Sequence, residues 1–390
     1  MDKQIVLITG GAGFLGQHLI REIQERQDDI KEIRVVDLIK HENKINYKEN
    51  IPVISYICDI SSMNEKCKEA FRDVRTVFHC AAYISYDFPP DKAKLNHNNV
   101  EGTRNVIEAC LENKVSSLIY TSSAEVCMKP YFNNGFFSII INQTESKELP
   151  PMEEDQLVFG SYAASKLKGE ELILSADNMR HFSGDSRLRT TALRPTFMYG
   201  EEDNGIFKKI MQIGNEYCNN ILWRIGGAGG RHQFVYAGNV AWAHIKAKIA
   251  LEDDAESVGG LPVFITDDTS LSDQFRFCEL LTESDGESVF KRSAWSVPSL
   301  LSFLLAFVFE LAYGVLFKIF SLNRIPFSPK GFIIYLGSAV FFSRLRAILH
   351  LAYSPLYTPV KAKLKSQEYY LLLCTNGLSN NYKSVNYKSF

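Results

Sequence analysis

The sequence predicts an α/β fold with a doubly wound parallel sheet, and three observations support this. Short apolar runs alternate with helical patterns through the first half of the 390 residues, which is typical of βαβ units. The first apolar run, residues 5–9, leads into three closely spaced glycines, and a second run ends in Asp37. A chain of this length is expected to hold one large α/β unit with appended segments.

The first turn of this pattern predicts a nucleotide site. Glycines at positions 10, 13 and 16 allow close approach of backbone to phosphate, and the following helix directs N–H groups and its positive dipole end at the anion. A carboxylate at Asp37 can accept both adenosine ribose hydroxyls and would repel a 2′-phosphate. The pattern predicts a Rossmann-type site for NAD rather than NADP. The residues expected in this turn are Gly10, Gly13, Phe14, Leu15, Gly16 and Asp37.

Further strands are expected at residues 53–57, 76–79, 117–120 and 190–193, and helices at 14–27, 92–112 and around residue 162. Ligands of open α/β sheets bind at the carboxyl ends of the strands. Asp59 is therefore expected near the adenine, and His79 is expected to pack within its strand. Other residues expected at the cofactor are Asp59, Ala81, Tyr162, Lys166 and Pro195.

The chain divides by pattern into four parts. We expect a NAD-binding Rossmann domain with the catalytic residues at 1–200, and a substrate-binding region interleaved with the main fold at 201–294. An apolar membrane-associated segment at 295–345 and a C-terminal region with a polar tail at 346–390 follow. Residues 128–158 lack periodicity and are expected to form a loosely ordered insertion over the substrate, and the last two dozen residues are expected to fray.

The apolar segment favours attachment to a membrane. Residues 300–317 carry one charge, Glu310, and reach about 27 Å as a helix, just enough for a hydrocarbon core. A Glu at the centre of a span costs about 2.5 to 3.5 kcal/mol, so a spanning helix, an interfacial helix and a core helix all stay open. Membrane attachment is favoured because the segment is apolar on every face and basic residues follow it.

Composition limits the other classes of partner. The net charge is −2 and there is no polybasic tract, so no nucleic-acid partner is expected. The eight cysteines show neither C-x-x-C pairs nor zinc-ligand spacing, and are expected to be reduced, with no metal site. No secretory signal pattern precedes the first strand, which favours a catalytic domain facing the cytosol.

A tyrosine and a lysine four residues apart carry the expected chemistry. Tyr162 and Lys166 share one helix face, and a nearby ammonium should lower the phenol pKa from about 10 toward the working range of a general base. Ser123, at a strand end, is expected to hydrogen-bond the reacting oxygen, with Ser122 as the alternative hydroxyl. Asn99 is expected to support the site through water. The predicted reaction is hydride transfer from a secondary alcohol to NAD, with Tyr162 accepting the hydroxyl proton.

Several motifs resemble those of a known family. Residues 9–16, Asp59, 99–103, 120–123, 162–166 and 193–195 look like the extended short-chain dehydrogenase/reductase superfamily. More narrowly, residues 33–37, 120–126, 192–195, 235–244, 265–269, 295–298 and 351–357 resemble the 3β-hydroxysteroid dehydrogenase/Δ5-4 isomerase family. This resemblance implies catalysis by Ser123, Tyr162 and Lys166, NAD as cofactor, and a 3β-hydroxysteroid or sterol substrate. It also implies residence in an endoplasmic reticulum membrane or a mitochondrial one. The partners expected besides the substrate are membrane lipid and a second copy of the chain in a homodimer.

Two alternatives remain. A nucleotide-sugar epimerase or dehydratase would share the fold, the Tyr–Lys pair and NAD. Those enzymes resemble one another in having an Arg and an Asp at two positions where this chain has His232 and Asn239. A catalytically inactive NAD-binding module needs only the glycines and Asp37, so intact Ser123, Tyr162 and Lys166 argue against it.

Overall fold

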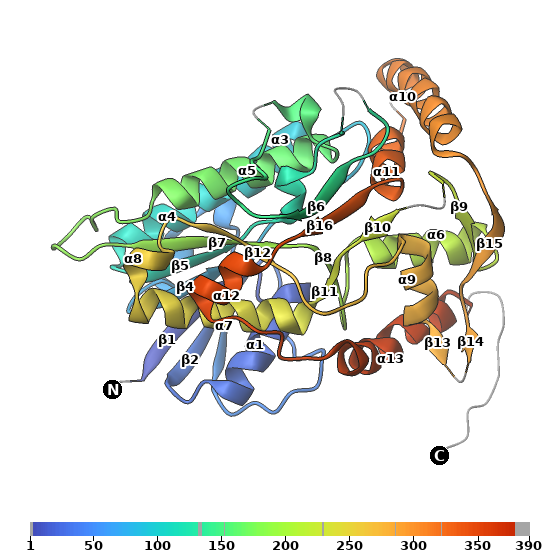
Figure 1. Cartoon of the computed structure of the whole chain (residues 1–390). Coiled ribbons are helices and arrows are strands. Elements are labelled where there is room, and N and C mark those ends of the chain that lie inside the picture. The colour runs from blue at the N-terminus through green and yellow to red at the C-terminus, as the bar shows by residue number, and fades with distance from the viewer. Residues whose placement is uncertain are drawn as a thin grey trace.

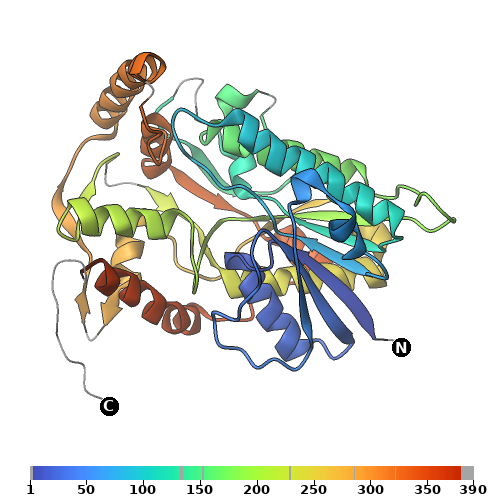
Figure 2. The same cartoon turned by 180° about the vertical axis from the view of Figure 1, so that it is seen from behind.

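The structure is a computed structural model of the chain. It describes residues 3–131, 135–151, 153–227, 230–284, 286–320 and 322–378. A central sheet lies between two layers of helices, and one long helix, α10, projects from the body (Figures 1 and 2).

The central sheet has seven parallel strands in the order β12-β7-β5-β4-β1-β2-β3. This confirms the predicted doubly wound fold, with the reversal of strand order falling between β1 and β4. The strands are β1 (Gln4–Thr9), β2 (Ile30–Asp37), β3 (Val53–Ile57), β4 (Thr76–His79), β5 (Ser117–Thr121), β7 (Arg189–Pro195) and β12 (Pro262–Ile265).

Side chains of β1 alternate between two cores. Val6 and Ile8 pack with α1 (Phe14–Arg26) and α7 (Ala237–Asp253), whereas Ile5 and Leu7 pack toward α4 (Gly102–Glu112) on the opposite face. Successive residues of a strand point to opposite faces, so a strand covered on both sides is apolar throughout. The helix expected at 92–112 is present without a gap, but its hydrogen-bonding pattern changes along its length. It consists of α3 (Lys92–Asn96), a π-helical turn (His97–Glu101) and then α4. The other helices around this sheet are α2 (Glu65–Glu69), α5 (Gly160–Ser175), α8 (Ala255–Val258) and α12 (Leu345–Leu351).

The region after the sheet is built from smaller elements. A three-stranded parallel sheet has the order β10-β16-β6, with β10 (Arg231–His232), β16 (Ala339–Phe342) and β6 (Ile139–Gln143). The expectation of a loosely ordered insertion at 128–158 is therefore wrong for β6, which pairs with a strand distant in sequence. The other elements are β8 (Phe197–Tyr199), α6 (Ile206–Tyr217), β9 (Ile221–Arg224), β11 (Phe234–Tyr236), α9 (Gln274–Leu281), β13 (Glu283–Ser284), β14 (Glu287–Ser288) and β15 (Lys291–Ser296).

The C-terminal part contains α10 (Ser299–Phe320), α11 (Pro329–Leu336) and α13 (Pro359–Leu378). The expected fraying of the last two dozen residues is wrong as far as Leu378, because α13 packs on α6 and α9. There the buried Tyr370 hydroxyl donates to Asp203 Oδ2 at 2.9 Å. Residues 379–390 lie outside the described part of the chain.

Two cysteines correct the expectation that all eight are reduced. Cys58 and Cys67 form a disulfide, with Cα atoms 5.9 Å apart. The end of β3 and α2 meet in space, which brings together two residues whose spacing matches no cysteine motif. In the described ranges, the structure has no cluster of three or more His, Cys, Asp or Glu side chains that would hold a metal.

Candidate active site

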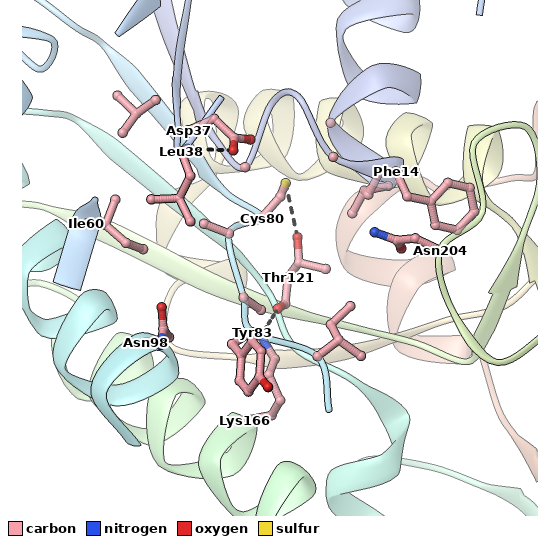
Figure 3. Close-up of a pocket in the computed structure, with 18 of the residues that line it drawn as sticks. Phe14, Asp37, Leu38, Ile60, Cys80, Tyr83, Asn98, Thr121, Lys166 and Asn204 are labelled. Atoms are coloured by element: carbon pink, nitrogen blue, oxygen red, sulfur yellow. Dashed lines mark hydrogen bonds between the residues drawn. The ribbon is translucent and has the colours of Figure 1, made fainter. Parts of the chain in front are cut away.

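A cleft of about 280 Å³ opens beyond the carboxyl ends of the central strands, where the strand order reverses (Figure 3). This is the place where open α/β sheets bind ligands. Most of the residues predicted from the sequence line it together: Gly10, Gly13, Phe14, Leu15, Gly16, Asp37, Asp59, Ala81, Tyr162 and Lys166.

The loop from β1 to α1 requires glycine at particular positions. Gly10 has φ of +73°, in the left-handed region, and a Cβ there would lie 2.7 Å from the Ala81 amide nitrogen. A Cβ on Gly16 would lie 2.4 Å from the Gly10 carbonyl oxygen. The tight loop therefore leaves its backbone and the N-terminus of α1 bare toward the cleft, as a pyrophosphate requires.

Asp37 fixes the same loop from the end of β2. Its Oδ2 accepts a hydrogen bond from the Ala12 amide at 3.0 Å, and its Oδ1 accepts one from the Leu38 amide at 2.7 Å. A carboxylate has about four lone-pair sites, so further acceptor capacity remains for two ribose hydroxyls. Figure 3 shows this side chain at the edge of the cleft.

Lys166 reaches across the cleft floor from α5. Its Nζ donates to the Thr121 carbonyl oxygen at 2.7 Å (Figure 3). The same atom lies 4.2 Å from the centre of the Tyr120 ring. Burial lowers the pKa of this lysine to about 7. The ammonium is thus held by β5 in a site where burial disfavours its charge.

Tyr162 is buried one helical turn away, with 6% of its surface exposed. Burial raises its pKa well above the ordinary phenol value, and the nearby Glu125 and Tyr120 add to this. This direction is opposite to the lowering expected from Lys166, because burial is the largest cause of the shift and the Lys166 ammonium is directed at the Thr121 carbonyl.

The two candidate serines differ in their environment. Ser123 Oγ accepts from the Glu125 amide at 3.2 Å, capping the short 3-10 turn that follows β5, and Ser123 is not among the residues that line the cleft. Ser122 does line it, and its buried Oγ has no hydrogen-bond partner in the described part of the chain. Ser122 therefore carries an unpaired hydroxyl beside the cleft, whereas the Ser123 oxygen caps the turn.

Asn99 forms direct hydrogen bonds to two segments that border the site. Its Oδ1 accepts from the Tyr83 amide at 2.7 Å, and its Nδ2 donates to the Tyr83 carbonyl at 3.0 Å and to Ser165 Oγ at 2.9 Å. It therefore ties the loop after β4 to α5. Pro195 lies at the buried end of β7 and is not among the cleft-lining residues.

His79, as expected, is packed: its ring nitrogens contact the hydroxyls of Thr9 at 2.7 Å and Thr103 at 3.0 Å.

Several residues of the cleft were not predicted from the sequence. Met198 and Asn204 reach the cleft from beyond β7. The cleft residues that the sequence did not single out include Leu38, Ile60, Tyr83, Asn98, Met198 and Asn204.

A second, larger cleft adjoins the first and shares Tyr162 with it. Its volume is about 1260 Å³. Tyr86 and Phe159 line it beside Tyr162, and Phe303 and Phe307 of α10 also line it. The phenol of Tyr162 therefore stands where the two clefts meet.

Helix α10 has two different sides. Ser302 and Ala306 are buried against the body, whereas its outer side is apolar and exposed. In the described ranges it is the one helix long and apolar enough to cross a membrane. Its single acid is engaged: Glu310 Oε1 accepts from Ser328 Oγ at 2.7 Å and from the Lys330 amide at 2.8 Å, at the N-terminus of α11. The exposed side chains are Leu300, Leu301, Leu304, Leu305, Phe307, Val308, Phe309, Leu311, Val315, Leu316, Ile319 and Phe320.

The profile of the 3-beta hydroxysteroid dehydrogenase/isomerase family matches residues 7–298. This chain belongs to that family. A 3 beta-hydroxysteroid dehydrogenase/Delta 5-->4-isomerase of monkeypox virus is 32% identical over 267 residues, covering 67% of this chain and 71% of the viral protein. The protein of the same name from vaccinia virus, strain Ankara, is 31% identical over the same share of both chains. The family's oxidoreductase activity is consistent with the Tyr162–Lys166 pair at the cleft.

Solved structures with the same fold are more distant in sequence. MoeE5, solved with UDP-glucuronic acid and NAD, has a TM-score of 0.64 at 18% identity, covering 95% of this chain and 98% of its own. The UDP-glucose 4-epimerase of Thermus thermophilus, solved with NAD, has a TM-score of 0.62 at 20% identity, covering 94% and 99%. These similarities confirm the Rossmann-type fold.

Proposed function

We propose that this chain is a NAD-dependent dehydrogenase that oxidises the 3β-hydroxyl of a steroid or sterol to the 3-ketone. The observation that carries this proposal is the position of Tyr162, which lines both the nucleotide cleft and the larger cleft. An alcohol bound in the larger cleft can thus meet a nicotinamide bound in the smaller one at a single phenol. The family relationship supports the sterol as the alcohol.

NAD is the cofactor of the smaller cleft. The bare glycine loop fits a pyrophosphate and Asp37 fits an unphosphorylated ribose, as described above. When bound, NAD would supply the hydride acceptor and, on its nicotinamide ring, a positive charge that favours the phenolate of Tyr162.

Each residue of the site has its own role in the proposed oxidation. The Tyr162 oxygen accepts the hydroxyl proton as the carbinol carbon gives up hydride, and in the reverse direction it returns the proton. Lys166 lies beside the same strand end, where its ammonium can hold ribose hydroxyls, while Ser122 or Ser123 donates to the reacting oxygen. Asn99 holds the loop after β4 against α5 through its hydrogen bonds to Tyr83 and Ser165.

The larger cleft and α10 favour a lipid-soluble substrate that arrives from a membrane. Phe303 and Phe307 line the cleft from the same helix whose outer side is apolar. Because Glu310 is bonded to the N-terminus of α11, α10 is tied to the folded body along its middle, which favours an interfacial helix over a spanning one. We propose membrane association in the endoplasmic reticulum, with the catalytic domain facing the cytosol and the cleft mouth at the lipid surface.

The nucleotide-sugar alternative has less support. At the two positions that distinguish it, His232 Nε2 is bonded to the Tyr335 carbonyl at 2.7 Å, and Asn239 Nδ2 donates to Asp267 Oδ2 at 2.8 Å. Both side chains are buried in the core and line neither of the two clefts. A sugar nucleotide also has no use for the apolar side of α10.

A substrate panel tests the proposal. The full chain is mixed with NAD and either a 3β-hydroxysteroid, UDP-glucose or UDP-galactose, and NADH and sugar products are followed. We expect NADH only with the steroid. Interconversion of the two UDP-sugars without net NADH would support the epimerase instead, and no reaction with any of them would support a binding module.

Charges on the outer side of α10 are expected to release the protein from membranes. Leu301 and Val308 are exposed and line no cleft. The double variant Leu301→Lys/Val308→Lys should bind phosphatidylcholine/phosphatidylserine vesicles at least about tenfold more weakly, because charged side chains are costly in the acyl region. Co-sedimentation measures this. Leu349→Lys, an exposed leucine of α12, is the matched control and should bind as the natural protein does. Equal binding of the double variant would exclude α10 as the attachment site.

A further inference from the structure

The loop between β8 and α6 places a polar side chain in the cofactor cleft, and the proposed oxidation does not use it. Asn204 lies in this loop, is exposed and lines the cleft. Figure 3 shows its amide beside Phe14, on the opposite side of the cleft from Asp37. Since Asp37 fits the adenosine ribose, Asn204 lies on the side that is left for the nicotinamide half of NAD.

The loop is packed against the start of α1. His18 of this helix lies edge-on to the Phe14 ring, with centroids 5.5 Å apart, and its Nε2 lies 2.9 Å from the Glu201 carbonyl oxygen. The Glu201 carboxylate accepts from Arg21 Nη1 at 2.9 Å. Since the N-terminus of α1 is the expected pyrophosphate site, these contacts hold the asparagine next to that site.

Helix α13 holds the same loop from a distant part of the chain. The buried Tyr370 hydroxyl donates to Asp203 Oδ2 at 2.9 Å and accepts from the Gly200 amide at 3.2 Å. The Tyr369 hydroxyl donates to the Asp203 carbonyl oxygen at 2.6 Å. Asp203 Oδ1 accepts from the Gly205 amide at 2.6 Å. Hydrogen bonds therefore fix both chain neighbours of the asparagine, and the bonds to one of them come from α13.

The backbone of this loop depends on such contacts. Glu202 has φ of +63°, in the left-handed region that few residues other than glycine adopt. A residue in this region costs free energy and keeps its conformation only where the surrounding structure holds it. Loss of the Tyr370 hydroxyl would leave a buried carboxylate oxygen and a buried amide unpaired, so we expect the loop to relax and the asparagine to move.

Helix α13 lies outside residues 7–298, the part of the chain that the family profile matches. It packs on α6 and α9, and α6 begins directly after the loop. A helix that follows the matched region therefore reaches the cofactor cleft through one short loop.

We propose that Asn204 holds the nicotinamide half of NAD and that Tyr370 positions Asn204 through Asp203. This rests on the part of the proposed function that places NAD in the smaller cleft. The Asn204 amide is able to donate to a phosphate or ribose oxygen and to accept from a ribose hydroxyl. Asn204 is thus a cofactor-binding residue. Tyr370 does not line the cleft and is a positioning residue.

The binding of two nucleotides tests this without any turnover. NADH carries the nicotinamide half, whereas AMP carries only adenosine and one phosphate. We expect Asn204→Ala to weaken NADH binding by at least about fivefold and AMP binding by less than about twofold, because it removes hydrogen bonds to the nicotinamide half alone. Isothermal titration calorimetry with the full chain measures both affinities.

Tyr370→Phe removes only a hydroxyl that lies outside the cleft. It should weaken NADH binding by at least about threefold and AMP binding by less than about twofold, because the misplaced asparagine loses the same contact. In the double variant Asn204→Ala/Tyr370→Phe, the NADH affinity should be no lower than in Asn204→Ala alone. A role of Tyr370 in stability alone would give neither the difference between the two nucleotides nor this lack of additivity.

Tyr353→Phe is the matched control. Tyr353 is 1% exposed, its hydroxyl has no hydrogen-bond partner in the described ranges, and it lines neither cleft, so NADH affinity should not change. Thermal unfolding shows which variants are folded at the temperature of the titration. If Tyr370→Phe is not, Tyr369→Phe takes its place, because it removes the bond to the Asp203 carbonyl from a less buried position.

Unchanged NADH affinity in Asn204→Ala, or equal losses for NADH and AMP, would overturn the role of Asn204. Additive losses in the double variant would overturn the positioning of Asn204 by α13. A natural protein that binds no NADH would instead overturn the assignment of NAD to the smaller cleft.

Discussion

Tyr162→Phe is expected to lower kcat for steroid oxidation by about 10²- to 10⁴-fold, the range of general acid–base catalysis, while NAD binds almost as before. The substitution removes only the hydroxyl oxygen that accepts the proton. The ring keeps its packing against Tyr86, with centroids 5.0 Å apart in the natural protein. Steady-state kinetics with a 3β-hydroxysteroid, together with NAD titration, measure both quantities.

The control for this variant is a tyrosine outside both clefts. Tyr217 at the end of α6 is 78% exposed, so Tyr217→Phe should leave kcat unchanged. If Tyr162→Phe keeps most of its activity, another group accepts the proton and the assignment of Tyr162 fails.

Gly16→Ala is expected to weaken NAD binding by at least about tenfold and to destabilise the fold by about 1 to 3 kcal/mol, the usual cost of overpacking. The new Cβ would lie 2.4 Å from the Gly10 carbonyl oxygen and 2.5 Å from Gly11 Cα. Both are backbone atoms, so the loop has to move away from α1, and the phosphate-facing N–H groups move with it. Fluorescence titration with NADH and chemical denaturation measure the two effects.

Gly314→Ala is the matched control for the glycine loop. Gly314 lies within α10, and the nearest atom to an added Cβ there is Phe88 Cζ at 4.0 Å. This variant should bind NAD normally and gain up to about 1 kcal/mol, because Ala is the better helix former. Normal NAD affinity in Gly16→Ala would show that the loop does not hold the pyrophosphate.

The sequence was sufficient for the parts of the fold that depend on local patterns. Alternating apolar runs placed the strands, since the side chains of a buried parallel strand are apolar on both faces. The glycine spacing and Asp37 placed one wall of the cofactor cleft, because both lie next to the turn that they shape. Tyr162 and Lys166 were found for the same reason, as the helical repeat puts residues four apart on one face.

What the sequence could not predict depends on contacts between distant segments. β6 is a strand because β16 pairs with it, and the Cys58–Cys67 disulfide forms because α2 packs beside the end of β3. Lys166 is directed at the Thr121 carbonyl, and the upward shift of the Tyr162 pKa comes from burial of the phenol, which the sequence does not reveal. In the sequence Glu310 is an isolated charge in an apolar helix, because its partners, Ser328 and Lys330, lie at the start of α11.

Hydride transfer from the carbinol carbon is the central claim, and a deuterated substrate tests it most directly. A 3β-hydroxysteroid with deuterium on C3 is oxidised by the natural protein with NAD, and the reduced cofactor is analysed by mass spectrometry. We expect one deuterium in the reduced nicotinamide and a slower rate than with the unlabelled steroid. Reduced cofactor without deuterium, or 3-ketone formed without any reduced cofactor, would contradict the account.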